Sequence, residues 1–217
     1  GKESELAENF SDAINKIQDE IKKLRTDAGE AANKISVSRQ KSALKVESEV
    51  VKTLKLLGIS DASFKVKINK IEPDKEKEDF LFYQNKKYLY SETGIDEVEF
   101  YISTNAGEDV KPLAKVASGG EVSRIMLSLK TILAKSDKLP VLIFDEIDTG
   151  VSGRIAQKVG TALRDLASFH QIIAITHLPQ IAGMADYHYS VEKKQIDDRT
   201  VSSIRRLNEN ERINEVA

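Results

Sequence analysis

The sequence predicts an α/β protein in which a parallel sheet core, with flanking helices and β-hairpins, follows one long N-terminal coiled-coil helix. Three observations lead to this fold class. In the first quarter of the chain, apolar residues recur at helical spacing. In the next part, apolar and polar residues alternate, as in strands. Farther along, two short apolar runs lie on either side of a further predicted helix. We therefore expect a coiled-coil arm over residues 1–57 and a globular part over residues 58–217.

Composition limits the possible functions. The 217 residues include no cysteine and carry a formal net charge of −2, so a disulfide framework and a thiolate metal site are excluded. Any DNA contact would need a local basic patch or a segment outside this sequence. The three histidines lack metal-ligand spacing. No apolar run approaches the roughly 20 residues of a membrane span, so we expect a soluble, cytoplasmic protein with no membrane partner.

The arm shows the seam of a coiled coil, because its apolar residues step mostly by three and four. These residues are Leu6, Phe10, Ala13, Ile17, Ile21, Leu24, Ala28, Ala31, Ile35, Val46, Val50, Leu54 and Leu57. A continuous helix from Glu5 to Leu57 would extend roughly 80 Å. So long a stripe needs a partner helix. The alternative is a helix pair folded on the globular part, with a bend near Gly29 or within residues 36–42.

Strands are expected next. Apolar residues alternate over 64–68 and again over 98–102, and "DFLFYQNKKYLY" predicts a hairpin that turns at Gln84 to Lys87. The mixed-charge segment from Glu72 to Asp79 is typical of a solvated turn. We interpret these strands as scaffold.

The segment "KVASGGEVSRIMLSLK" predicts a capped helix. Ser118 and Glu121 have the spacing of a capping box, and Gly119 and Gly120 leave the first backbone N–H groups uncovered, so a phosphate could approach without meeting a Cβ. On these residues alone, a plain capped helix with flexible glycines stays open. The expected apolar face comprises Val122, Ile125, Met126, Leu129, Ile132 and Leu133.

The segment "KLPVLIFDEIDTGVSGR" predicts a parallel strand over residues 141–144, buried on both faces. It ends in Asp145 and Glu146, at the sheet edge where ligands bind in open α/β folds. The first carboxylate can hold Mg²⁺ and the second can activate a water for attack on phosphate. A calcium loop is excluded because Ile147 stands where an oxygen ligand is required.

The remaining elements follow in order. A helix is expected from Ile155, Val159, Leu163 and Leu166, then a buried strand over residues 172–175, a short helix opened by Pro179, and a hairpin of residues 187–191 and 200–204. The second strand ends in Thr176 and His177. This histidine can reach the same phosphate as a hydrogen-bond donor.

Three segments, in this order, resemble the motifs of the ATP-binding-cassette ATPases: "ASGGE" the signature motif, "VLIFDEID" Walker B with its D-loop, and "ITHLPQ" the switch-histidine loop. The coiled coil favours the SMC-like branch. "FDEIDTGVSGR", "THLPQIAGMADYH" and "STNAGEDVKPLAKVASGGEVSRIMLSLK" resemble the RecN family of bacterial DNA repair proteins. Ala117 and Glu121 replace the Leu and Gln common in transporter signatures, and a glutamate there suits this branch.

The resemblance implies the C-terminal lobe of an SMC-type ATPase head that uses ATP and Mg²⁺. Asp145 would help hold Mg²⁺, Glu146 would polarise the attacking water, and His177 would contact the γ-phosphate. Asp148 would lie in the D-loop and cross a dimer interface. The residues implied to bind the ATP of an opposing head are Ser118, Gly119, Gly120 and Glu121. Arg124 is a weaker candidate for DNA or interface contact, and an exposed surface arginine is an equal alternative.

One expected part is absent from the sequence, which contains no Gly-Lys-Ser or Gly-Lys-Thr triplet. The resemblance places this phosphate-cradling P-loop in the N-terminal half of the same polypeptide, beyond the coiled coil. We therefore expect a fragment that is inactive alone and an ATPase when completed by that half. Expected partners are that half, a second head in an ATP-sandwiched homodimer, and DNA in the nucleoid. The alternatives are a transporter nucleotide-binding subunit and a non-catalytic coiled-coil adaptor.

Overall fold

The computed structural model describes residues 2–74, 79–116, 118–134, 139–196 and 199–216. Its contacts separate the chain into two compact units. One comprises Gly1–Glu47 with Lys65–Tyr101, and the other comprises Ser48–Phe64 with Ile102–Ala217. The division expected at residues 57 and 58 lies next to the end of the first helix, whereas both compact units include part of that helix. That division stays a prediction.

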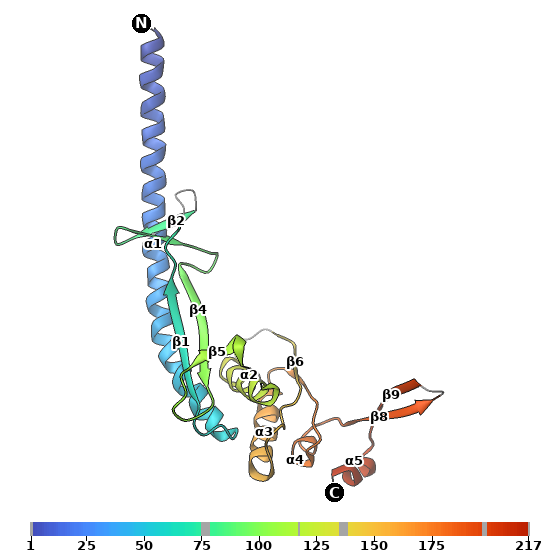
Figure 1. Ribbon diagram of the computed structural model, residues 1–217. Helices are drawn as coiled ribbons and strands as arrows, with labels where there is room; N and C mark the ends of the chain where they lie inside the picture. Colours follow the sequence, from blue (N-terminus) through green and yellow to red (C-terminus); the bar gives the residue numbers. More distant parts are fainter. Residues whose placement is uncertain (1, 75–78, 117, 135–138, 197–198, 217) are drawn as a thin grey trace. The chain divides into compact units, whose positions relative to one another are not determined.

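Helix α1 (Lys2–Leu56) is continuous, as Figure 1 shows. The expected long helix is therefore confirmed, and it does not break at Gly29 or between residues 36 and 42. Gly58, with a φ of 88°, follows the last turn in a left-handed conformation that a residue with a Cβ rarely adopts.

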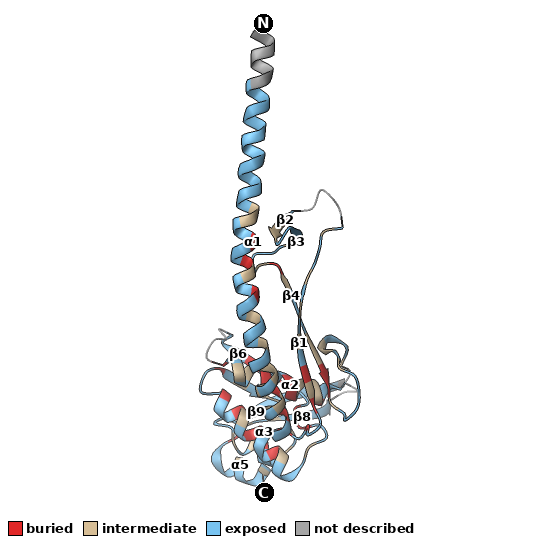
Figure 2. Cartoon of the chain, turned by 90° about the vertical axis from the view of Figure 1, so that its left-hand side faces the viewer, coloured by how far each residue is buried: buried red, intermediate tan, exposed pale blue. Residues whose placement is uncertain are grey.

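The apolar seam of α1 is largely exposed. Phe10 is 69% exposed, Ile17 57% and Leu24 60%, and Figure 2 shows most of the N-terminal half of the helix in the colour of exposed residues. Side chains this apolar are covered in most soluble proteins when they form a continuous stripe. The seam is therefore a surface suited to a partner helix.

The first unit holds most residues of the four strands expected between Phe64 and Ile102. β1 (Ser63–Lys70), β4 (Asp96–Ser103) and β5 (Lys111–Pro112) form a sheet in the order β1-β4-β5, and β5 belongs to the second unit. β2 (Phe80–Tyr83) and β3 (Lys86–Leu89) form an antiparallel hairpin. Its turn residues Gln84 and Asn85 have φ angles of 48° and 60°, as a two-residue hairpin requires. The expected hairpin is confirmed. Part of the expected turn over residues 72–79 lies outside the described residues.

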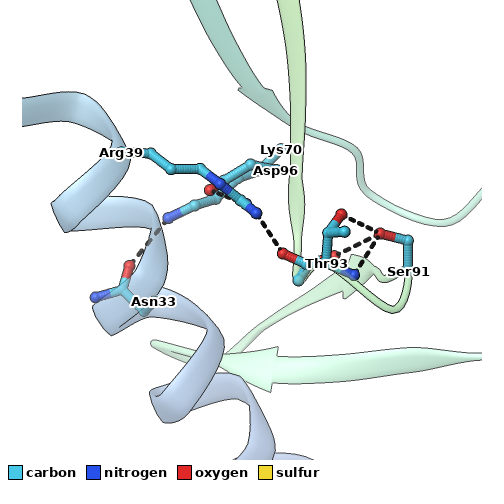
Figure 3. Close-up of polar contacts among 7 residues, drawn as sticks. Asn33, Arg39, Lys70, Ser91, Thr93 and Asp96 are labelled. Atoms are coloured by element: carbon cyan, nitrogen blue, oxygen red, sulfur yellow. Dashed lines mark hydrogen bonds and ion pairs between the residues drawn. The ribbon is translucent and has the colours of Figure 1, made fainter. Parts of the chain in front are cut away.

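Polar contacts fix the middle of α1 to the strands of its unit (Figure 3). Arg39 donates to Asp96 Oδ2 over 3.0 Å and to the Thr93 carbonyl over 2.6 Å. Lys70 Nζ donates to Asn33 Oδ1 over 3.1 Å. The Asp96 side chain is fully buried, so this ion pair is screened less by solvent than an exposed one.

The hairpin also packs closely against α1 at Gly29. A Cβ added there would lie 1.9 Å from the Phe82 carbonyl oxygen, which is backbone and cannot rotate away. We expect Gly29→Ala to displace the hairpin and to speed amide exchange in Leu89, whose N–H donates to the Ile71 carbonyl over 2.8 Å, by at least about tenfold. Ser38→Ala, at an exposed position of the same helix, is the control because it raises helix propensity without a clash. Unchanged exchange in Gly29→Ala would contradict this packing.

The second unit contains a small parallel sheet with helices packed on it. β6 (Val141–Phe144) and β7 (Gln171–Ala174) are parallel, with Val141 opposite Gln171. α2 (Gly119–Leu133), α3 (Gly153–Leu166) and α4 (Pro179–Ala182) are the helices, and a 3-10 turn η1 (Leu113–Lys115) precedes α2. The core cluster includes Leu57, Leu127, Leu142, Phe144, Ile147, Val159, Leu163, Leu166 and Ile181. The expected inner face of α3 is confirmed at Val159, Leu163 and Leu166.

The expectation that β6 is buried on both faces is wrong for this chain. Leu142 and Phe144 are buried, whereas Val141 is 41% exposed and Ile143 67% exposed. On β7, Ile173 is 44% exposed. The reason is that the core cluster covers one face of the sheet, and among the described residues the sheet has two strands. The other face is apolar and exposed.

The buried face of α2 also differs from the expected one. Ile125 and Leu129 are buried as expected, but Met126 and Leu133 are 36% and 43% exposed. Arg124, Leu127 and Ser128 are buried instead. The polar residues Arg124 and Ser128 can face inward because backbone carbonyls accept hydrogen bonds from them. Ser128 Oγ donates to the Val50 carbonyl over 3.3 Å.

The chain ends in a hairpin and a helix. β8 (Tyr189–Ile196) and β9 (Arg199–Arg206) are antiparallel, which confirms the expected hairpin and extends it. α5 (Glu209–Val216) was not expected. Its signal is present in the sequence, since Asn208 and Glu211 form a reciprocal capping box of 2.9 and 2.8 Å. No helix among the described residues is long and apolar enough to cross a membrane.

Candidate nucleotide site at the ends of β6 and β7

The candidate site is built on the segment that follows β6, residues 145–149. Asp145 and Glu146 are both exposed, and Asp145 Oδ1 accepts from the Glu146 backbone N–H over 2.9 Å. Glu146 has a φ of 55°, a left-handed conformation that costs free energy for a residue with a Cβ. The Thr149 N–H donates to the Glu146 carbonyl over 3.1 Å. The two carboxylates thus sit on a tight, defined turn at the carboxyl end of a strand.

Asp148 joins this segment to the residues after β7. It is 4% exposed, and its Oδ2 accepts from Thr176 Oγ1 over 2.5 Å and from the His177 N–H over 2.8 Å. Burial raises the pKa of Asp148, but these hydrogen bonds and the nearby His177 outweigh it, so the pKa lies below its usual range. The carboxylate is ionised at neutral pH. The structure directs it into its own chain, and its expected contact across a dimer interface stays a prediction.

His177 lies beside Asp148 with an accessible ring. Its Nδ1 is 3.0 Å from Asp148 Oδ2, and its side chain is 77% exposed. A carboxylate at one ring nitrogen favours the tautomer that leaves the other nitrogen free for a ligand. Asp148 therefore orients the histidine.

The start of α2 forms the opposite side of the segment. Ser118 is the N-cap, and its Oγ accepts from the Glu121 N–H over 3.5 Å. Glu121 Oε2 accepts from Thr104 Oγ1 over 3.2 Å, which replaces the expected return bond to Ser118. The expected cap is confirmed in its serine half.

The two glycines of α2 lie close to the segment, and packing requires glycine at Gly120, where the neighbours include backbone atoms. A Cβ on Gly119 would lie 2.0 Å from Glu146 Oε2. A Cβ on Gly120 would lie 2.8 Å from Thr149 Cβ and 3.0 Å from the carbonyl oxygens of Glu146 and Thr149. This close approach is a reason for glycine that the sequence did not reveal, whereas the exposure of backbone N–H groups to a phosphate stays a prediction.

Two further residues of α2, which the sequence did not single out for this role, bond to the segment. Ser123 Oγ donates to the Asp145 carbonyl over 2.5 Å, and Arg124 Nη1 donates to the Thr149 carbonyl over 2.7 Å. Arg124 is 6% exposed, so an exposed surface arginine is ruled out, and burial lowers its pKa against the opposing effect of Glu121. The signal in the sequence for Arg124 is a charged residue among the apolar residues of a predicted helix.

The residues fit Mg²⁺ as a partial ligand set. Among the described residues there is no group of three or more His, Cys, Asp or Glu side chains placed to hold a metal ion. Mg²⁺ is commonly bound by one or two carboxylates together with substrate phosphates and waters. The exposed Asp145 carboxylate, next to an exposed Glu146, suits that arrangement.

All eight residues singled out by the sequence lie in one region of the second unit. Asp145, Glu146 and Asp148 occupy the segment, residues 118–121 lie on the side of α2, and His177 lies on the side of β7. The arrangement offers an exposed carboxylate pair, an oriented histidine and a helix N-terminus that is exposed at Ser118 and Gly119, which together suit the handling of a phosphate group.

Known proteins share this sequence and fold. No protein-family model matches the chain. The DNA repair protein RecN of Halalkalibacterium halodurans is 38% identical over 206 residues, which cover 95% of this chain and 34% of that protein. RecN of Bacillus subtilis is 36% identical over 214 residues, with coverages of 99% and 37%. The chain thus spans about a third of the length of the curated relatives it matches.

The fold agrees with this relationship. The solved Smc head domain with a coiled coil and joint from Pyrococcus yayanosii has a TM-score of 0.52 and 19% identity, and covers 96% of this chain and 33% of that one. The chain therefore shares the fold of this Smc head domain with its coiled coil. Since the matches extend over nearly the whole chain and include every motif of the site, the chain belongs to the RecN family, whose C-terminal part it matches.

Proposed function

We propose that this chain is the C-terminal lobe of an ATPase head that hydrolyses ATP once an N-terminal lobe supplies the P-loop. The observation that carries the proposal is the placement of the segment 145–149. It is bonded to α2 on one side and to Thr176 and His177 on the other. Hydrogen bonds thus join the three segments that resemble the signature, Walker B and switch-histidine motifs.

Each side chain takes a role that its position supports. Glu146 orients the attacking water and accepts its proton. His177 donates a hydrogen bond to the γ-phosphate from Nε2 in the form that carries a proton on both ring nitrogens, with Nδ1–H held by Asp148. Asp145 would hold Mg²⁺, which would neutralise charge on the phosphates when bound.

The start of α2 serves a second nucleotide. Ser118, Gly119 and Gly120 bind the γ-phosphate of an ATP held by an opposing head, at the positive end of the helix dipole. Glu121 fixes the start of this helix through Ser118 and Thr104. Two heads then enclose two ATP molecules, so that binding closes the dimer and hydrolysis reopens it.

Two exposed apolar surfaces support the need for an N-terminal lobe with its own arm. One is the seam of α1, which includes Phe10 and Leu24, and the other is the uncovered face of β6 and β7, which includes Ile143 and Ile173. A second coiled-coil helix would cover the first. Further strands and helices of the same head would cover the second.

The name of the RecN relatives indicates DNA repair, and the form of repair proposed for this chain is recombinational repair of double-strand breaks. ATP-driven closure of two heads would control how broken DNA is held. The net charge of −2 means that DNA contact depends on a local surface or on the rest of the protein.

Steady-state ATP hydrolysis with Mg²⁺ tests the proposal. The chain alone and a RecN-family N-terminal lobe alone, with its arm, are each expected to be silent, and their mixture is expected to turn over ATP. Complex formation is checked by size-exclusion chromatography. Turnover by the chain alone, or silence in a mixture shown to assemble, would contradict the composite site.

A further inference from the structure

Arg124 is the sixth residue of α2 and one of the few buried charged residues of the second unit. Its Nη1 donates to the Thr149 carbonyl over 2.7 Å, and its Nε is buried without a hydrogen-bond partner among the described residues. Burying a guanidinium is costly, and a buried unsatisfied donor adds to that cost. An apolar side chain of similar length would fill the space with less loss of stability, so the charge is present for its bond to the segment.

The bond belongs to a pattern that involves both ends of the segment 145–149. Ser123 and Arg124 are consecutive, and they donate to the carbonyls of Asp145 and Thr149. One turn earlier, Gly120 packs on Thr149. A single stretch of α2 therefore fixes the start and the end of the segment that carries Glu146.

We propose that Arg124 is a positioning residue that holds residues 145–149 to the start of α2, so that the helix and the two exposed carboxylates move together. This inference rests on the proposed function, because the carboxylates act on ATP there. The inference adds that the start of α2 and the Glu146 turn are coupled within one head. A phosphate that binds the N-terminus of α2 shifts a helix to which the Glu146 turn of the same chain is bonded.

The chain alone allows a direct test through amide exchange measured by NMR. The Thr149 and Val151 N–H groups donate to the carbonyls of Glu146 and Asp148, so they report on the segment itself. Arg124→Met keeps the bulk and removes the donor, and we expect it to speed exchange at these two amides by at least about tenfold while Val159 in α3 stays unchanged. Arg124→Lys, which retains one donor, is expected to restore part of the protection.

Arg164→Met is the matched control, because Arg164 is exposed on α3 and its loss should leave every amide unchanged. Unaltered exchange at Thr149 and Val151 in Arg124→Met would overturn the proposal. An equal acceleration at Val159 would also overturn it, since the arginine would then support the fold as a whole.

The assembled ATPase gives a second readout. Arg124→Met is expected to lower kcat by at least about tenfold and to change KM for ATP by less than about twofold, because the side chain lies behind the segment and not against the nucleotide. An unchanged kcat, or a raised KM alone, would overturn the positioning role. If the unmutated assembly does not hydrolyse ATP, the proposed function fails, whereas the exchange result still decides whether Arg124 holds the segment.

Discussion

Glu146→Gln in the assembled ATPase is expected to lower kcat roughly a hundredfold or more, because the amide cannot accept the proton of the attacking water. The side chain is exposed and the substitution keeps its size, so the lobe should retain its stability. ATP binding should remain, and the closed dimer should accumulate because hydrolysis no longer reopens it. Steady-state turnover and size-exclusion chromatography with ATP measure the two effects.

Glu209→Gln is the matched control for this substitution. Glu209 is an exposed glutamate in the first turn of α5, and its change removes the same charge from the lobe. Turnover in this variant should equal that of the unmutated assembly. If Glu146→Gln retained full turnover, the catalytic role of Glu146 would be wrong and a non-catalytic adaptor would gain support.

Gly120→Ala is expected to destabilise the lobe by about 1–3 kcal/mol, as other overpacked positions do. The added Cβ would meet Thr149 Cβ at 2.8 Å and two carbonyl oxygens at 3.0 Å. Because these carbonyls belong to a turn bonded to α2, they cannot withdraw without breaking those bonds. Urea unfolding of the chain, followed by circular dichroism, measures the change.

The neighbouring glycine provides the comparison. In Gly119→Ala the added Cβ would meet the end of the Glu146 side chain, which can rotate away, so the stability should change by less than about 0.5 kcal/mol. Both variants gain the same helix propensity, and their difference therefore isolates the packing against the turn. Equal stability of the two variants would show that α2 does not approach the segment as closely as described.

Local patterns predicted most of the elements, and they named the candidate site residues that the structure brings into one region. The helical period of residues 5–57, the alternation in β1 and β4, and the turn at Gln84 and Asn85 each depend on neighbours within a few positions. The site residues could be named because each motif is a short run, and because the order of three runs is far more specific than one. α5 was missed although its Asn208–Glu211 cap is equally local.

The sequence did not reveal which side chains face inward at the site. The contacts of Asp148 with Thr176 and His177 in its own chain were not expected, and its contact across a dimer interface stays a prediction. Arg124 was considered a candidate for DNA or interface contact, with an exposed surface arginine as an equal alternative, and it is buried. Both outcomes depend on acceptors or donors that lie some 25 to 29 residues away along the chain, which no local pattern reports.

The sequence by itself therefore determined the long helix, the hairpins, the motifs and the family, because these depend on short periods and short runs of residues. Only the tertiary structure decided that β6 is covered on one face, that α2 turns Arg124 and Ser128 inward, and that Gly119 and Gly120 make room for the Glu146 turn. The physical reason is that burial and hydrogen bonding are settled by which distant segments meet. The sequence shows which residues are apolar and how they are spaced, whereas packing decides whether each of them is covered.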